Sequence, residues 1–107
     1  MAELVTLARP YAKAAFEAAA AEGRLTEWQV MLDTLAGVVA HEKMSAILSQ
    51  PSLTSLRQSA ILLDVCGDAV NEKGGNLVRM LADNKRIALL PEIARQFTAL
   101  KAEKEKT

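Results

Sequence analysis

The chain has 107 residues, which is enough for one domain with a modest core. Its 13 Lys and Arg residues balance its 13 Asp and Glu residues, and only 4% of the sequence is aromatic, so neither charge nor composition favours nucleic acid or an anionic membrane as a partner. One cysteine and one histidine exclude an internal disulfide and a metal site built from Cys and His within the chain, and no other pattern predicts a cofactor.

The first twenty residues contain an alanine run but do not resemble a secretory signal. Charged side chains at Glu3, Arg9, Lys13 and Glu17 interrupt them at regular intervals. No window approaches the ~18 consecutive apolar residues of a membrane span. The single thiol, Cys66, is expected to be buried, which suits a reducing compartment. The sequence therefore predicts a water-soluble cytoplasmic protein with no segment inserted into a membrane.

Apolar residues recur at helical spacing along the chain, and strand-favouring residues never alternate over a useful length. The sequence therefore predicts an all-α fold, a bundle of six helices of which two are short, with no sheet. Gly23 and Gly67 are expected to end the first and the fourth helix. The expected helices are, in chain order, Leu4–Glu22, Thr26–His41, Glu42–Ser49, a fourth that begins between Ser52 and Ser55 and ends at Cys66, Asn76–Asn84, and a sixth from Ile87 to Leu100 or beyond.

Local signals predict several details of these helices. Pro10 lies inside the first helix and should bend it, because proline removes a backbone donor. Thr26 and Gln29 have the spacing of a capping box. The segment 71–76 is expected to be a loop or a frayed entry to the fifth helix, which should end with Asn84 in a left-handed conformation. The inward face of the fourth helix is expected to consist of Leu56, Ala60, Leu63 and Cys66.

The sequence offers no arrangement typical of catalysis. His41 stands beside Glu42 at a helix junction, which we interpret as a solvated helix end rather than a catalytic pair. Cys66 ends an apolar stripe and is interpreted as a small core residue. The paired glycines at 74–75 lack the Lys and Ser or Thr of a phosphate-binding loop. We therefore expect a protein that is not an enzyme.

The first helix carries more apolar surface than one buried face requires. At about 100° per residue, its polar side chains fall in one narrow stripe and the apolar remainder divides into two flanks. The flank expected to hold the domain together contains Val5, Ala12, Phe16 and Ala19. The surplus flank contains Leu7, Tyr11, Ala14 and Ala18.

The fifth helix repeats this pattern, since its apolar residues spread over more than half of its circumference. They are Leu77, Val78, Met80, Leu81 and Ala82. Either both helices are surrounded by their own domain, or they line a groove that receives a partner helix. In such a groove the alanines would allow the partner to approach closely, and Tyr11 would supply an anchor. The residues alone favour the two interpretations equally. A further alternative is a self-associating helical scaffold that buries the same flank in a homodimer.

Four stretches also carry a family resemblance. They are VTLARPYAKAAFEAA at 5–19, Thr26–Trp28, VCG at 65–67 and NLVRMLADNKRIALLPEIARQF at 76–97. In this order and spacing they resemble the N-terminal domain of the ATP synthase delta subunit, whose mitochondrial counterpart is the oligomycin-sensitivity-conferring protein. One departure is Lys85, where many members of the family have glycine.

This resemblance implies a six-helix domain over 1–105 without chemistry of its own, and a C-terminal domain, absent from this chain, through which the b subunit would be bound. It implies a stator domain of the F-type ATP synthase, peripheral to the inner membrane. Such a domain binds the N-terminal helix of an alpha subunit between its first and fifth helices and holds the catalytic head against rotor torque during proton-driven ATP synthesis. Carried over by position, the partner-binding residues are Leu7, Tyr11, Ala14, Ala18, Leu77, Val78, Met80 and Leu81.

Overall fold

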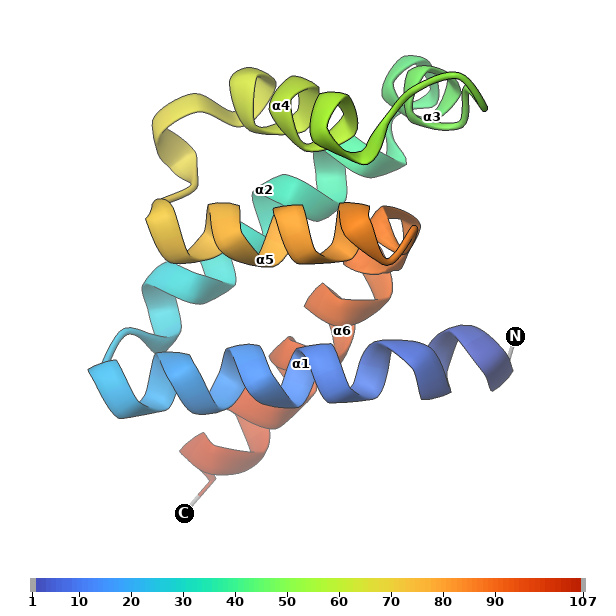
Figure 1. Ribbon diagram of the computed structural model, residues 1–107. Helices are drawn as coiled ribbons and strands as arrows, with labels where there is room; N and C mark the ends of the chain where they lie inside the picture. Colours follow the sequence, from blue (N-terminus) through green and yellow to red (C-terminus); the bar gives the residue numbers. More distant parts are fainter. Residues whose placement is uncertain (1, 107) are drawn as a thin grey trace.

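In the computed structural model, which describes residues 2–106, the chain forms six α-helices and two 3₁₀ turns, and no strand occurs in this range. The predicted all-α fold with six helices is confirmed (Figure 1). The helices are α1 (Ala2–Glu22), α2 (Leu25–Ala40), α3 (Glu42–Leu48), α4 (Ser55–Cys66), α5 (Glu72–Asp83) and α6 (Leu90–Glu105), and the 3₁₀ turns are η1 (Gly67–Ala69) and η2 (Ile87–Leu89).

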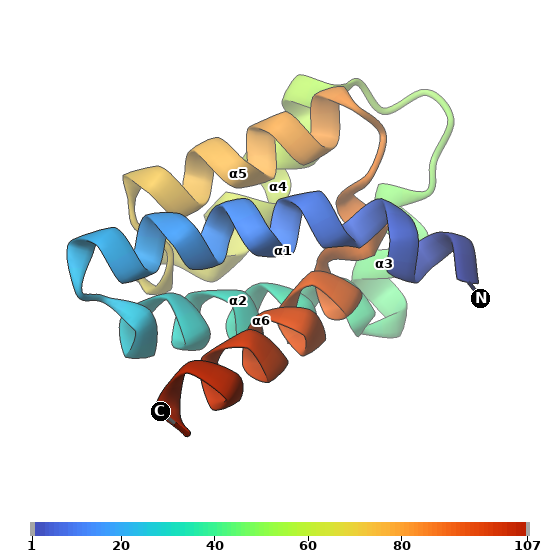
Figure 2. The same ribbon diagram turned by 90° about the horizontal axis from the view of Figure 1, so that it is seen from below.

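The core lies where α6 crosses α1 and α2. Helix α6 packs closely against both, while α4 packs against α5 (Figures 1 and 2). Phe97 of α6 is fully buried and meets Phe16 of α1 edge to face, with the ring centroids 5.8 Å apart. Burying one such side chain contributes on the order of 2–3 kcal/mol. The other large side chains that are fully buried are Leu32, Leu35, Leu62, Val78, Leu81, Leu90 and Ile93.

The connection between α1 and α2 is only two residues long, and this sets the start of α2. Gly23 has a φ of +68°, and the N–H groups of Gly23 and Arg24 donate to carbonyls three and five residues earlier, which ends α1 in a Schellman turn. Helix α2 therefore begins at Leu25, and Arg24 precedes it without a side-chain cap. The predicted capping box of Thr26 and Gln29 is wrong, because Thr26 already lies inside the first turn.

The segment 71–76 is the start of α5 and not a loop. The Asn71 side-chain oxygen caps the helix by accepting the N–H of Gly74 at 2.9 Å. Gly74 is buried, and a Cβ at this position would lie 2.8 Å from Cγ1 of Val70 and 3.1 Å from Sδ of Met31. Glycine therefore serves close packing of α5 on its neighbours, and this packing outweighs its low helix propensity.

The end of α5 also differs from the prediction, because the left-handed residue is Lys85 and not Asn84. Lys85 has a φ of +59°, whereas Asn84 has a φ of −91°. The N–H groups of Lys85 and Arg86 donate to carbonyls of α5 at 3.0 and 2.7 Å, which again closes a Schellman turn. The consequence is that the Asn84 side chain is free to reach α1.

Helix α4 buries a different face from the one predicted. The prediction for Cys66 is confirmed, but Leu56 is 74% exposed, Ala60 is exposed and Leu63 is only half-buried. A polar residue takes one of the inward positions, because the Ser59 hydroxyl donates to the carbonyl of Leu56 at 3.0 Å and so needs no water. The buried positions of α4 are Ser59, Leu62 and Cys66.

Candidate partner-binding surface

Helices α1 and α5 run side by side in opposite chain directions, although each packs mainly against other helices (Figures 1 and 2). Polar contacts join them at two places, Tyr11 to Asn84 and Glu22 to Lys73. On each helix these two contacts are eleven residues apart, so residues spaced between them by three or four positions lie on the facing edges. We call these edges the α1–α5 seam. It consists of Tyr11, Ala15, Ala18 and Glu22 of α1, of Lys73, Leu77 and Met80 of α5, and of Asn84, which follows α5.

The first end of the seam is organised around the hydroxyl of Tyr11. This oxygen accepts hydrogen bonds from Nδ2 of Asn84 at 3.1 Å and from Nη1 of Arg86 at 3.2 Å. The guanidinium carbon of Arg86 also lies 5.9 Å from the centre of the Tyr11 ring, within the range of a cation–π contact. Tyr11 is 8% exposed, so its ring fills the seam while its polar tip joins the helices.

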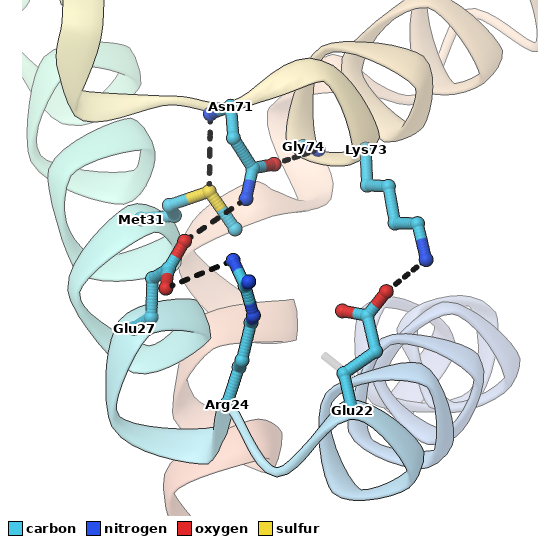
Figure 3. A network of polar contacts seen from close by, with 7 residues as sticks. All are labelled: Glu22, Arg24, Glu27, Met31, Asn71, Lys73 and Gly74. Atoms are coloured by element: carbon cyan, nitrogen blue, oxygen red, sulfur yellow. Dashed lines mark hydrogen bonds and ion pairs between the residues drawn. The ribbon is translucent and has the colours of Figure 1, made fainter.

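The second end is a polar network that joins α1, α2 and α5 (Figure 3). Lys73 of α5 forms an ion pair with Glu22 of α1, and hydrogen bonding to this ammonium is the main reason that the pKa of Glu22 is lowered. Asn71 donates from Nδ2 to Oε2 of Glu27 at 3.1 Å, and its backbone N–H donates to Sδ of Met31 at 3.3 Å. The charges here are therefore paired within the domain.

Between its two ends the seam is apolar and partly open. Met80 is 43% exposed and Ala18 is half-buried. Beside the seam on α1, Leu7 is 39% exposed and Ala14 is exposed. The four other residues predicted to bind a partner are buried beneath this surface. They are Tyr11, Leu77, Val78 and Leu81.

The sequence prediction did not include the polar residues that bound the seam. These residues lie at or beyond the ends of the apolar stretches, so the pattern of apolar residues does not indicate them. They are Glu22, Lys73, Asn84 and Arg86. The signal that could have found them is the equal eleven-residue spacing of a polar or hydroxyl-bearing pair on each helix.

A hollow of about 690 Å³ lies elsewhere, under the connection between α3 and α4. Hydroxyl and amide groups of this connection contribute much of its lining. The Ser55 hydroxyl donates to Oδ1 of Asp83 at 2.9 Å, and Nε2 of Gln58 donates to the carbonyl of Leu48 at 2.8 Å. These groups hold the connection in place by hydrogen bonding to one another.

The titratable groups of the described chain show no cluster typical of a reaction centre. Among residues 2–106 no group of three or more His, Cys, Asp and Glu side chains could hold a metal ion. His41 is exposed and caps α3, its Nδ1 accepting the N–H of Lys43 at 3.2 Å, as expected for a helix end. Burial raises the pKa of the Cys66 thiol, which disfavours the reactive thiolate. None of the described helices is both long and apolar enough to cross a membrane.

The class defined by this fold and surface is an all-helical bundle that leaves an apolar seam open between two of its helices. The comparison with known families is more specific, since residues 7–107 match the family model of the ATP synthase delta (OSCP) subunit. The chain belongs to this family, and the resemblance seen in the sequence is confirmed. The delta subunit of this family is a non-catalytic structural subunit of the ATP synthase and a component of its stator.

Individual relatives agree with this assignment. The chain is 51% identical over 107 residues to the ATP synthase subunit delta of Hahella chejuensis, and 48% identical over 107 residues to that of Cellvibrio japonicus. It is 47% identical over 106 residues to that of Teredinibacter turnerae. These alignments cover 99–100% of this chain and 60% of each relative, so the chain spans about three fifths of the relatives' length.

Proposed function

We propose that this domain binds the N-terminal helix of an ATP synthase alpha subunit along the α1–α5 seam. In this role it ties the catalytic head to the stator and so resists rotor torque during proton-driven ATP synthesis, at the periphery of the membrane. The contact with the b subunit would be made by the remaining part of the delta subunit, which this chain does not span. The observation that carries the proposal is an apolar seam, open at Met80 and flanked by exposed Leu7 and Ala14, that polar contacts between α1 and α5 bound at both ends. The other exposed large apolar side chains have no such frame. They are Leu4, Val30, Ile47, Leu56 and Val65.

The dimensions of the seam suit one short helix. Eleven residues separate its two polar ends on each helix, which corresponds to about 16 Å, or three turns of a docked helix. Ala14 and Ala18 present small side chains, so a partner backbone can approach α1 closely, while Met80 can adapt its shape to the partner. A helix with apolar residues at intervals of three and four positions would bury Ala18 and Met80 together.

The direct test is calorimetric titration of the domain with a synthetic peptide of the alpha subunit's N-terminus. We expect binding with a negative heat-capacity change and a gain of peptide helicity, because apolar surface is buried as the helix forms. Absence of binding at high micromolar peptide would contradict the proposal.

A matched pair of variants locates the binding surface. Ala14→Asp places a charge beside the seam and should weaken peptide binding at least tenfold, because the partner would bury the charge without a counter-ion. Ala60→Asp changes another exposed alanine, on α4, and should bind as the wild type does. Equal loss in both variants would show that the effect is not specific to the seam. Sedimentation of the domain alone tests the alternative, since a tight homodimer would favour self-association through this surface.

A further inference from the structure

At the Tyr11 end of the seam, several hydrogen-bond donors have no acceptor within residues 2–106. A hydroxyl oxygen accepts with two lone pairs and donates one hydrogen. In Tyr11 both lone pairs are occupied, by Nδ2 of Asn84 and by Nη1 of Arg86. The Tyr11 O–H therefore remains as a donor, and within residues 2–106 no acceptor is in place for it.

Arg86 adds further donors and an unbalanced charge. Only one of the five N–H groups of its guanidinium is used within the described chain, for Tyr11, and no carboxylate of residues 2–106 lies within ion-pair distance of it. The side chain is half-buried, so it has given up part of its hydration without gaining a counter-ion. Arg24 and Arg95, by contrast, each have a glutamate partner. The arginines that also have no carboxylate partner within residues 2–106 are exposed, and they are Arg9, Arg57 and Arg79.

The backbone at Arg86 is fixed beside Tyr11. The N–H of Arg86 donates to α5 at 2.7 Å as part of the Schellman turn, and its carbonyl accepts the N–H of Leu89 at 3.0 Å. The ring of Tyr11 is buried and cannot turn away. The Tyr11 hydroxyl and the Arg86 guanidinium lie together, with one net positive charge and no counter-ion, and are suited to a carboxylate, which offers acceptor sites on both oxygens.

We propose that Tyr11 and Arg86 together bind the carboxylate of an aspartate or glutamate on the helix that docks along the seam. This inference rests on the proposed function, because it concerns the same occupant. The opposite end of the seam offers no equivalent site, since Glu22 and Lys73 already pair with each other. The difference between the two ends sets the direction of the partner. Its acidic residue lies at the Tyr11 end and its apolar residues extend from there toward Glu22, over about 16 Å.

The test is a double-mutant cycle between the domain and the alpha N-terminal peptide. Each Asp and Glu of the peptide is replaced in turn by Asn or Gln, and binding is measured to the wild type, to Arg86→Met and to Arg79→Met. Arg79 is an exposed arginine of α5 outside the seam, so Arg79→Met controls for the loss of one positive charge. We expect one peptide position where replacing the acid by its amide weakens binding to the wild type about tenfold, and binding to Arg79→Met by the same factor. The same replacement should weaken binding to Arg86→Met less than twofold.

Two further variants keep the test decisive if Arg86→Met folds poorly by circular dichroism. Tyr11→Phe retains the ring and removes only the hydroxyl, and it should reduce the effect of the same peptide position. Arg86→Lys keeps the charge but not the planar fork, and it should restore part of the affinity. If the peptide binds but no acidic position couples to Arg86 or Tyr11, the inference is wrong and the proposed function stands. If the peptide does not bind the wild type at all, both fail.

Discussion

Helix α1 contributes to two regions of the molecule that are built differently. Toward α6 and α2 its contacts are mainly apolar and closed, and Ala8, Ala12 and Ala19 have no exposed surface. Toward α5 its contacts are polar and lie at two ends, with an open apolar stretch between them. A helix with apolar residues on most of its circumference can therefore be fully covered by its own domain on one side and only partly covered on another. Its closed side stabilises the fold, and we propose that its open side receives a partner.

The largest contrast should appear when a large side chain is truncated in each region. Phe97→Ala on the closed side should lower the free energy of unfolding by about 3–5 kcal/mol, because it leaves a cavity against Phe16. Met80→Ala on the open side should cost less than about 1 kcal/mol, because that side chain is 43% exposed. Urea unfolding measures both changes. Similar losses in the two variants would show that the seam is as much a part of the core as α6 is.

A smaller effect is expected where α5 approaches α2. Gly74→Ala should destabilise the fold by about 1–3 kcal/mol, since its Cβ would lie 2.8 Å from Val70 and 3.1 Å from Met31. Gly37→Ala is the matched control, because Gly37 lies inside α2 with open space around its Cβ position. That change should stabilise the domain by about 0.5–1 kcal/mol. Thermal unfolding of the two variants should shift in opposite directions, and a stabilising Gly74→Ala would contradict the close packing described for α5.

The smallest effect is expected at the turn that positions Asn84 and Arg86. Lys85→Gly should stabilise the fold by about 0.5–1 kcal/mol, because a φ of +59° strains any residue with a Cβ while glycine tolerates it. Lys85→Ala removes the same side chain and keeps the strain, so its unfolding free energy should stay close to that of the wild type. If the alanine variant gains as much as the glycine variant, the effect comes from the lysine side chain and not from the backbone.

The sequence predicted helices well wherever packing and local propensity agree. The apolar stripes of α2 and α6 are buried, except that Val38 and Leu100 are only half-buried. The predictions failed where tertiary packing overrides a local rule. Glycines at 74–75 have low helix propensity, yet they lie inside α5 because the neighbouring side chains leave no room for a Cβ at Gly74.

The candidate surface was predictable only in part. Surplus apolar area on two helices indicated which helices to consider, and the structure shows Leu7, Ala14 and Met80 exposed there. Helical periodicity could not separate these from Val78 and Leu81, which are fully buried, because that depends on how far α5 rotates toward α4. The contact between Arg86 and Tyr11 could not be predicted either, since it joins residues 75 positions apart.

The most direct test of the central claim is an amide chemical-shift map of the domain with the alpha N-terminal peptide added. The account predicts that the largest shifts fall along α1 from Leu7 to Ala18 and along α5 around Leu77 and Met80, with Arg86 among them. Residues of the exposed α4 surface, such as Leu56 and Ala60, should change little. Shifts concentrated on α4, or no saturable shifts anywhere, would contradict the claim that the α1–α5 seam is the docking surface.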